Sequence, residues 1–264
     1  MGRVGPTVDT DAWEFAKGQP CGSSWISMNK ICRKGGGGEG GSAPSRNDLP
    51  EYWQERAEFG ESRYDRKLEQ AQTTHTGEKP QELVKKMEPY TKLSGDEKAS
   101  IQMYGQAGVS EQIYDHMNAK LRLGIEPPED KKAAIDFTAH HLNKALDKIP
   151  DSSGEFYRAV ASESVAKTMT GLKPGDVLVD KGFGSYSDRG GPNISPFFDR
   201  SSQHNIVMVV QGKKFKNVSP VMPYQEGEHL SKPGTQLKLV RVATEDGYYH
   251  RKIGYVPTYY FEEV

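Results

Sequence analysis

Hydrophobic residues in the middle of the chain recur at helical spacing. Three helices are expected there, over residues 94–105, about 110–126 and 129–148. Ser94 opens the first of them, because a glutamate follows three positions later, as in a capping box. Pro127-Pro128 is expected to end the second helix, since proline disfavours the helical conformation in the residue before it.

After residue 150 the pattern changes to short β-prone runs that are separated by turns with Gly or Pro. Strands are expected over residues 155–160, 177–179, 185–187, 204–210, 237–242 and 248–256. A turn is expected at Gly212-Lys213-Lys214, and a short helix over residues 165–170. Short connections indicate a mostly antiparallel sheet, and helices followed by strands favour an α+β fold.

The first 93 residues show a weaker pattern. Residues 1–50 are expected to form a disordered extension or linker, because residues 35–41 are almost entirely glycine. Residues 51–93 are rich in charge and compatible with helix, so we expect a polar helical lead-in. The folded domain is then expected to comprise residues 94–264.

The composition limits the classes of function. The 264 residues include 35 basic and 36 acidic side chains, for a net charge of −1, and 34% are hydrophobic. A near-neutral total gives no support for bulk nucleic-acid binding or for attraction to an anionic membrane. No apolar run approaches the roughly 18 residues of a membrane-spanning helix, so no membrane insertion is expected. The first residues lack the apolar region of a secretory signal peptide.

No metal site is expected. The spacing of Cys21 and Cys32 fits neither a zinc site nor a redox pair, so we expect reduced, structurally idle thiols, with a disulfide between them as the alternative. His140 and His141 are adjacent on an expected helix and point to different faces. Residues 74–80 copy a zinc-finger linker, but no cysteines and histidines flank them at zinc spacing, which indicates a polar turn.

Two carboxylates lie one residue apart at Glu226 and Glu228. If this segment is extended, both side chains point to the same face. Two like charges on one face are costly unless a cationic group, a hydrogen bond or a shared proton compensates them. Chemistry that passes through an oxocarbenium-like sugar carbon is one use for such a pair. The alternative is an acidic hairpin shoulder on a solvated surface.

Three elements, the acidic pair included, stand in order along the chain. They are an arginine within a strand at Arg158, a hydroxyl-rich strand at Ser185-Tyr186-Ser187, and the acidic turn itself. Smaller motifs accompany them: Tyr104, Tyr114-x-x-x-Asn118-x-x-Leu121-Arg122, Phe156-Tyr157-Arg158, Phe183-Gly184-Ser185-Tyr186-Ser187, and Glu228-His229-Leu230 before Pro233-Gly234-Thr235. The order resembles that of mono-ADP-ribosyltransferase toxins of the Arg–Ser–Glu-x-Glu class, in particular the enzymatic domains of clostridial binary toxins and related exoenzymes. The resemblance covers about residues 94–264, with tyrosine at position 186 where that family has threonine.

The resemblance implies a fold and a catalytic group. The fold would be ADP-ribosyltransferase-like, with N-terminal helices packed on a mostly antiparallel two-sheet β core. Glu228 would stabilise positive charge at the anomeric carbon of NAD and bind the ribose 2′-hydroxyl. Glu226 would orient and deprotonate the acceptor. Arg158 would bind an NAD phosphate, and Ser185 would hold Glu228 by a hydrogen bond.

The resemblance also implies contacts to NAD, which would serve as co-substrate. Tyr114 and Asn118 would line the phosphate side. The loop over residues 188–203 would contribute Phe197, stacked on nicotinamide, and Arg200 at a phosphate. Arg189 is an alternative to Arg200, and Phe198 to Phe197. Tyr224 would contact the protein target.

The implied activity is mono-ADP-ribosylation of arginine in a target protein, since glutamate at position 226 goes with an arginine acceptor in that family. The alternatives are an NAD glycohydrolase, a transferase to a non-protein acceptor, and an inactive fold that serves as a binding module. The expected context is a monomeric toxin or effector that is secreted or injected into the cytoplasm of a target or host cell. A delivery partner or an injection apparatus would carry it there.

Overall fold

A computed structural model describes most of the chain from residue 43 onward and three short pieces before it. The described residues are 14–15, 19–21, 24–26, 43–73, 80–105, 113–190, 194–199, 201–222 and 227–264. All structural statements below refer to these residues.

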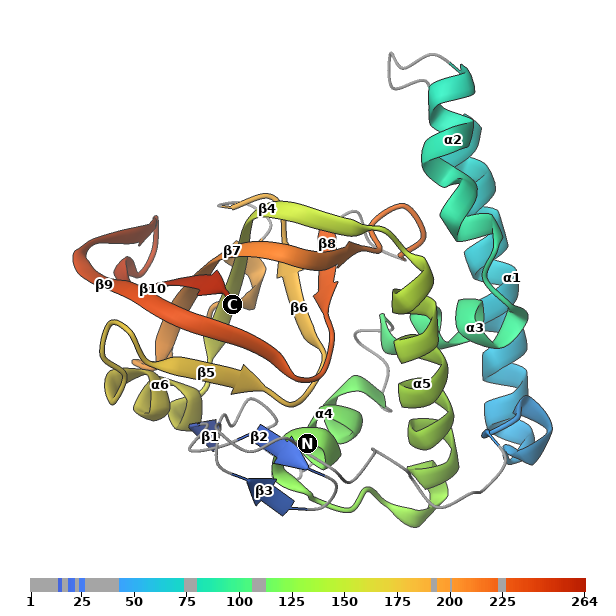
Figure 1. Cartoon of the computed structure of the whole chain (residues 1–264), viewed down its shortest axis with the longest axis horizontal. Coiled ribbons are helices and arrows are strands. Elements are labelled where there is room, and N and C mark those ends of the chain that lie inside the picture. Colours follow the sequence, from blue (N-terminus) through green and yellow to red (C-terminus); the bar gives the residue numbers. More distant parts are fainter. Residues whose placement is uncertain are drawn as a thin grey trace.

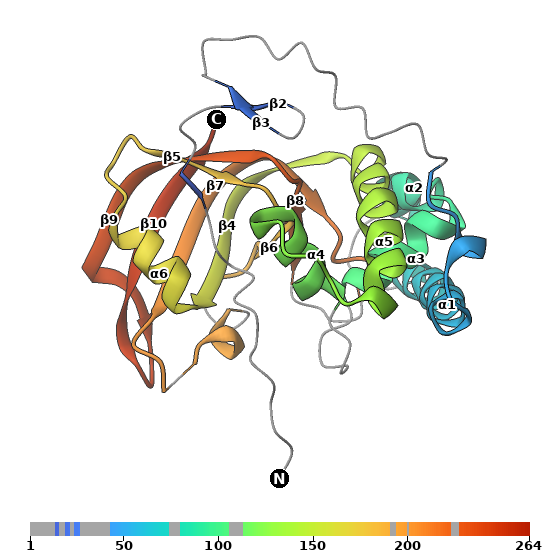
Figure 2. The same cartoon turned by 90° about the horizontal axis from the view of Figure 1, so that it is seen from below.

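Five helices form a layer at one end of a large sheet (Figures 1 and 2). A sixth helix lies apart from them, against the sheet. The helices are α1 (Glu51–Thr73), α2 (Pro80–Thr91), α3 (Gly95–Tyr104), α4 (Ile113–Leu123), α5 (Glu129–Lys148) and α6 (Glu163–Thr170), with 3₁₀ turns η1 (Arg46–Asp48) and η3 (Ser195–Phe197). The helix expected over residues 129–148 has the bounds of α5.

Eight described strands form one sheet in the order β1-β5-β9-β10-β7-β4-β6-β8. The strands are β1 (Glu14–Phe15), β4 (Asp151–Ala161), β5 (Val177–Asp180), β6 (Gly184–Ser187), β7 (Asn205–Asn217), β8 (Glu228–Ser231), β9 (Thr235–His250) and β10 (Gly254–Glu263). Two more, β2 (Gln19–Cys21) and β3 (Ser24–Ile26), form a separate pair. Neighbouring strands of the large sheet are antiparallel except β10 and β7, which are parallel.

The expected α+β class and mostly antiparallel sheet are therefore confirmed. The two layers of the β core are hydrogen-bonded to each other, however. Strand β8 pairs with β6 and also with β7, so β7, β4, β6 and β8 form a closed ring of strands. The sheet therefore bends back on itself, since β8 is hydrogen-bonded to β6 on one side and to β7 on the other.

The ends of α3 and α4 follow from their capping residues. The Ser94 side chain accepts the backbone N–H of Glu97, whose carboxylate accepts the N–H of Ser94, so the predicted capping box is present. Helix α4 ends earlier than expected, at Leu123. Gly124 has a φ of +67° and stops the helix in a left-handed cap, and Pro128 instead precedes the first residue of α5.

Strand β7 continues through residues 212–214, where the sequence predicted a turn. Gly212 is needed there for close packing, because a Cβ atom at this position would lie 2.8 Å from the Phe156 ring. The carboxylate of Glu263 accepts the backbone N–H groups of Lys213 and Lys214 and so holds the two residues against β10. The glycine marks a close approach of two strands.

Three groups of buried side chains hold the elements together. One lies between the helices and the end of the sheet, where Phe183 and Leu230 meet residues of α1 to α5. A second fills the inner face of the sheet under α6, around Phe156 and Phe215. The third lies under η3 on the opposite face and includes Ile194 and Phe198. The candidate site lies beside the first group.

The N-terminal residues take part in this architecture. Helices α1 and α2 contribute Trp53, Tyr64 and Met87 to the core that also contains α3 and α5. Within residues 1–50, β1 pairs with β5, and η1 is held by its own capping box. The domain boundaries proposed from the sequence stay predictions. None of the described helices has the length and apolar character that crossing a membrane requires.

Replacing Ser94 with alanine should destabilise the fold by about 1 kcal/mol, because it removes the hydrogen bond to the N–H of Glu97 at the start of α3. Urea unfolding followed by circular dichroism measures the change. Ser62→Ala, an exposed position within α1, should stay within about 0.5 kcal/mol of the parent. Equal effects of the two substitutions would contradict the capping account.

Candidate active site

Strands β6 and β8 bring together two of the residues that the sequence singled out. The strands are antiparallel, with Ser185 opposite Leu230 and Ser187 opposite Glu228. Side chains of opposed residues share a face, so Ser185 and Glu228 are diagonal neighbours on one face. The Ser185 hydroxyl donates a hydrogen bond of 2.7 Å to Oε1 of Glu228. The expected hydrogen bond between these side chains is present.

The backbone of Glu228 is fixed from the other side as well. Its carbonyl oxygen accepts hydrogen bonds from the N–H groups of Val218 and Ser219, at 3.0 and 3.1 Å. Gln102, fully buried in α3, donates to the carbonyl of Val221 in the same turn. The helical layer therefore supports the turn that precedes the acidic segment.

Gly227 lies immediately before Glu228, the first residue of β8. Its φ is +65°, and a Cβ atom on it would lie 2.0 Å from Oδ1 of Asp188. The segment is therefore not extended at Gly227, and β8 begins only at Glu228. The expectation that Glu226 and Glu228 share a face stays a prediction, because Glu226 lies outside the described residues. The Gly227 carbonyl accepts the N–H of Asp188 at 3.0 Å, which holds the turn against the end of β6.

A buried ion pair supports the turn between β5 and β6. Arg122 of α4 donates from Nε and Nη2 to the two carboxylate oxygens of Asp180, at 2.8 and 3.1 Å. The Arg122 side chain is 2% exposed and that of Asp180 is 0% exposed. The guanidinium also donates to the carbonyl of Phe183, and Asp180 accepts the N–H of Gly182. These bonds fix the backbone two residues before Ser185.

Asn118 also stabilises the turn between β5 and β6. Its Oδ1 accepts the backbone N–H of Phe183 at 2.9 Å, and the residue is 4% exposed. A Cβ atom on Gly182 would lie 2.6 Å from this oxygen and 2.7 Å from Nε of Arg122. The Asn118 side chain thus stabilises the turn between β5 and β6, and its predicted contact with NAD stays a prediction.

Tyr104 of α3 lies between Tyr114 of α4 and Phe183. Tyr104 makes edge contacts with the rings of Tyr114 and Phe183, with centroids 6.2 and 6.0 Å apart. Burial raises the pKa of Tyr104, and the nearby Glu228 carboxylate raises it further, against the opposite effects of Arg158 and Arg122. Tyr104 therefore stays protonated near neutral pH, and its hydroxyl lies within the electrostatic reach of Glu228.

Arg158 lies in the middle of β4, opposite Met208 of β7. Its guanidinium carbon is 5.9 Å from the centroid of the buried Tyr186 ring. Burial raises the pKa of Tyr186, and the positive charge of the nearby Arg158 opposes this rise. Tyr186 thus provides a contact for the arginine of β4.

The loop after β6 places its two phenylalanines differently. Phe198 is 8% exposed and stacks on Tyr248, with ring centroids 5.6 Å apart. Phe197 is 51% exposed at the end of η3. Phe198 anchors the loop to the sheet, and Phe197 is the ring that solvent reaches. Three residues singled out from the sequence lie outside the described residues, namely Glu226, Tyr224 and Arg200.

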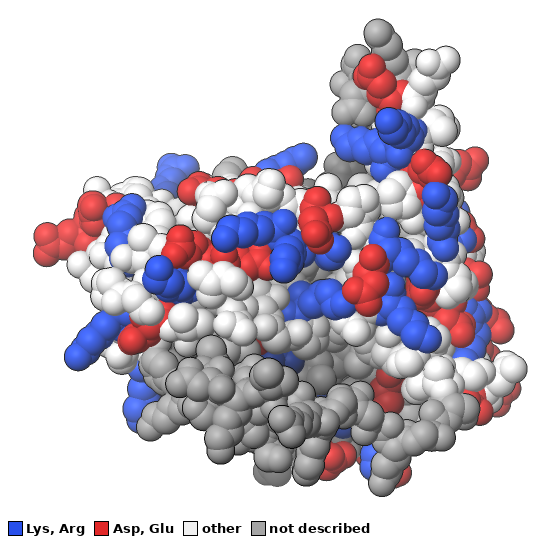
Figure 3. All heavy atoms as spheres, viewed as in Figure 1, with Lys and Arg blue, Asp and Glu red and all other residues white. Residues whose placement is uncertain are grey.

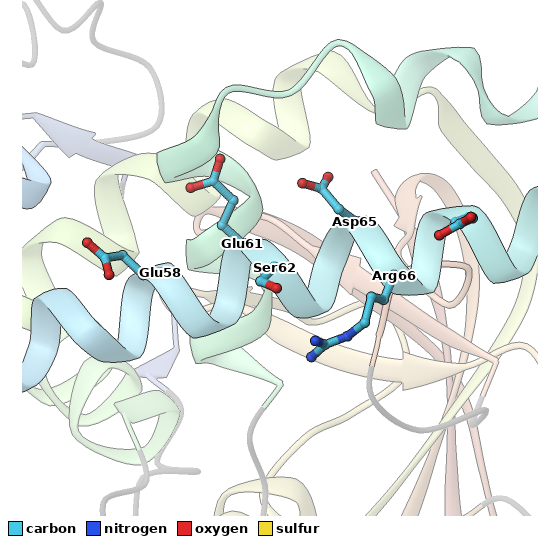
Figure 4. Close-up of a pocket in the computed structure, with 6 residues that line it drawn as sticks. Glu58, Glu61, Ser62, Asp65 and Arg66 are labelled. Atoms are coloured by element: carbon cyan, nitrogen blue, oxygen red, sulfur yellow. The ribbon is translucent and has the colours of Figure 1, made fainter.

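A solvent-facing hollow lies elsewhere, along the outside of α1 (Figure 4). Its lining residues are Glu58, Glu61, Ser62, Asp65, Arg66 and Glu69. Glu61 pairs with Arg46 at 2.7 Å and Asp65 with Lys98 at 2.8 Å, so these carboxylates attach α1 to its neighbours. On the face in Figure 3, basic and acidic side chains are interspersed. The described residues include no group of three or more His, Cys, Asp or Glu placed to hold a metal.

Sequence reasoning missed the supporting residues Asp180 and Asp188. The run Asp180-x-Gly182-x-Gly184 carried a signal, because two glycines close to a strand indicate close approaches of other groups. Gly227 carried a similar signal, since glycine is the residue that most readily adopts a positive φ. The partners of these glycines are far away in the sequence and were not readable from it.

Comparison with known proteins shows the fold. No protein-family model and no curated protein sequence matches the chain. Among solved structures, the ADP-ribosyltransferase Vis of Vibrio splendidus is similar, with 18% identity, a TM-score of 0.54, and coverage of 80% of this chain and 85% of Vis. One Vis structure, with a TM-score of 0.50, holds agmatine.

Two further solved structures have the same fold. Exoenzyme S of Pseudomonas aeruginosa, in complex with human 14-3-3 protein beta and carba-NAD, has 17% identity and a TM-score of 0.51 over 81% of this chain and 89% of that one. The ADP-ribosyltransferase HopU1 of Pseudomonas syringae pv. tomato has 13% identity and a TM-score of 0.54 over 83% and 100%. The expected ADP-ribosyltransferase-like fold is confirmed.

Replacing Asp180 with asparagine should destabilise the protein by about 3–5 kcal/mol, because it removes the negative charge opposite the buried Arg122 guanidinium. Urea unfolding measures the loss. Asp147→Asn is the matched control, since its carboxylate pairs with Lys232 and its side chain is 63% exposed. The control should cost less than about 1 kcal/mol. A loss at Asp180 no larger than that of the control would contradict the assigned support.

Proposed function

We propose that the chain is a mono-ADP-ribosyltransferase of the Arg–Ser–Glu-x-Glu class that cleaves NAD and transfers ADP-ribose to an arginine of a target protein. The observation that carries the proposal is the hydrogen bond between Ser185 and Glu228 on paired strands, in a fold shared with bacterial ADP-ribosyltransferases. The charges of both Glu228 and Arg158 act on Tyr104, so these two side chains lie within electrostatic range of Tyr104.

Glu228 is the proposed catalytic carboxylate. Cleavage of the bond between nicotinamide and ribose develops positive charge at the anomeric carbon, which a fixed carboxylate stabilises. Ser185 holds Oε1, and the carbonyl of Glu228 is fixed by Val218 and Ser219, so the group needs little reorganisation during the reaction. The protonated Tyr104 nearby adds no competing negative charge.

The proposed contacts to NAD are distributed over the two layers. They comprise Arg158 at a phosphate, Tyr114 and Asn118 on the phosphate side, Ser185, Phe197 at the nicotinamide, and Arg200 at a second phosphate. The half-exposed Phe197 ring supports its assignment over the buried Phe198. Carba-NAD bound to exoenzyme S supports NAD as the co-substrate. The proposed reaction needs no metal.

Glu226 is proposed to bind and deprotonate the acceptor arginine, and Tyr224 to contact the target protein. A carboxylate suits a guanidinium, because it pairs with the planar donor group and can accept its proton. The agmatine complex of Vis supports this acceptor class, since agmatine carries a guanidinium group. Exoenzyme S, solved with human 14-3-3 protein beta, supports a host protein as partner.

The proposed context is a toxin or effector that acts as a monomer in the cytoplasm of a target or host cell, after secretion or injection. The similar structures include proteins named as toxins and effectors. An NAD glycohydrolase and a transferase to a non-protein acceptor remain the alternatives, because both would use Glu228 in the same way.

Replacing Glu228 with glutamine should lower the rate of nicotinamide release from NAD by at least about a hundredfold, because it removes the charge that stabilises the transition state. Liquid chromatography of nicotinamide measures the rate. Glu262→Gln, which alters an exposed carboxylate paired with Lys238, is the control and should keep the parent rate. A parent protein that releases no nicotinamide would leave only the binding-module alternative.

Replacing Glu226 with glutamine should preserve NAD cleavage while transfer to agmatine or to proteins of a host lysate falls by about 10²–10⁴-fold, because the proposed base is lost. Labelled NAD measures both reactions in one incubation. Nicotinamide release without transfer in the parent protein would identify a glycohydrolase. Equal loss of both reactions in the variant would contradict separate roles for the two glutamates.

A further inference from the structure

His229 directly follows the proposed catalytic carboxylate and points to the other face of β8. Adjacent strand residues alternate between the two faces, so the imidazole lies away from the Glu228 side chain, opposite Tyr186 of β6 and Asn217 of β7. The residue is 4% exposed. Its ring packs on Phe156, with ring centroids 4.7 Å apart. The imidazole therefore has a fixed orientation within the core and little contact with solvent.

One hydrogen bond sets the tautomer of this imidazole. Nδ1 of His229 lies 3.0 Å from the carbonyl oxygen of Gly227. A carbonyl oxygen can only accept, so Nδ1 carries the hydrogen and Nε2 carries the lone pair. Burial lowers the pKa of His229, against the opposite effects of the Gly227 hydrogen bond and the charge of Asp188. The ring is therefore neutral near neutral pH and donates from Nδ1.

The Gly227 carbonyl oxygen has two donors. The backbone N–H of Asp188 also donates to it, at 3.0 Å, from the end of β6. This carbonyl belongs to the planar peptide group that leads into Glu228, so holding the oxygen also holds the nitrogen of Glu228. The next peptide group is held as well, because the Glu228 carbonyl accepts two backbone N–H groups from the loop after β7. Both peptide groups that flank Glu228 are thus anchored, and His229 supplies a side-chain donor to the first.

We propose that His229 is a positioning residue for Glu228. The inference rests on the proposed function, in which a fixed carboxylate meets the anomeric carbon of NAD. Without the Nδ1–H donor, the first peptide group loses one of its two donors. It also belongs to a glycine, whose backbone rotates with little steric resistance. A rotated peptide group would displace Glu228, and a displacement of about 1 Å can lower a rate about a hundredfold.

Two substitutions separate this role from packing. His229→Leu keeps an apolar side chain against Phe156 but has no donor. His229→Asn fills less of the core but keeps an N–H donor as many bonds from the backbone as Nδ1. Nicotinamide release should show a kcat about tenfold lower in His229→Leu, with KM for NAD within about twofold of the parent, and a kcat within about threefold of the parent in His229→Asn. Urea unfolding should show His229→Asn as the less stable variant, because it leaves a cavity.

His141→Leu is the matched control, because the His141 ring also lies against a backbone carbonyl, with Nε2 2.7 Å from the oxygen of Pro44. This contact is in the helical layer, so the control should lose stability and keep the parent kcat. Nitrogen-15 NMR of the imidazoles in the parent protein gives a readout that needs no variant. His229 is expected as the Nδ1–H tautomer near neutral pH.

The outcomes separate this inference from the proposed function. Nicotinamide release by a parent protein whose His229 is the Nε2–H tautomer would overturn the inference and leave the function intact. Values of kcat that follow the stability of the two variants would overturn it too, and would assign His229 to packing alone. A raised KM for NAD with an unchanged kcat would assign it to NAD binding instead. A folded parent protein with the Nδ1–H tautomer and no nicotinamide release would reject the proposed function, and with it the role of His229.

Discussion

The buried ion pair between Arg122 and Asp180 is the interaction on which the candidate site depends. It joins α4 to β5 with two hydrogen bonds, and both side chains are almost fully removed from solvent. Burying two charges is costly, and good geometry with further hydrogen bonds offsets the cost. Here the additional partners are backbone groups of Gly182 and Phe183, which lead into β6. The pair thereby sets the position of the strand that carries the site serine.

Strand β8 begins at Glu228, directly after a glycine with a positive φ. Glu228 is the first residue of β8, and a serine hydroxyl and two backbone N–H groups hold it. Glu226 precedes a glycine whose positive φ and contact with Asp188 interrupt the strand. Contacts from β6 and from the loop after β7 therefore fix Glu228 from two sides.

Local signals in the sequence predicted the positions of helices better than the contacts between elements that are far apart in the chain. The capping box at Ser94 and the period of residues 129–148 are local, so the positions of α3 and α5 followed from them. Gly212 was misread as a turn, because a glycine needed for close approach looks the same in sequence as one needed for a bend. The pairing of Asp180 with α4 was not readable, since it joins residues 58 positions apart. The contact between Ser185 and Glu228 was found only through the resemblance to a family.

The helical layer supports the turn that precedes the acidic segment. The turn before the acidic segment is bound by Gln102 of α3 at the carbonyl of Val221, and Tyr90 of α2 donates to the carbonyl of Asn217 at 2.7 Å. Buried backbone carbonyls need such partners, because an unpaired one is costly in free energy. Removing α2 would expose the end of β7, from which the chain continues toward Glu226. Helix α2 therefore helps to hold the end of β7, from which the chain leads to the acidic segment.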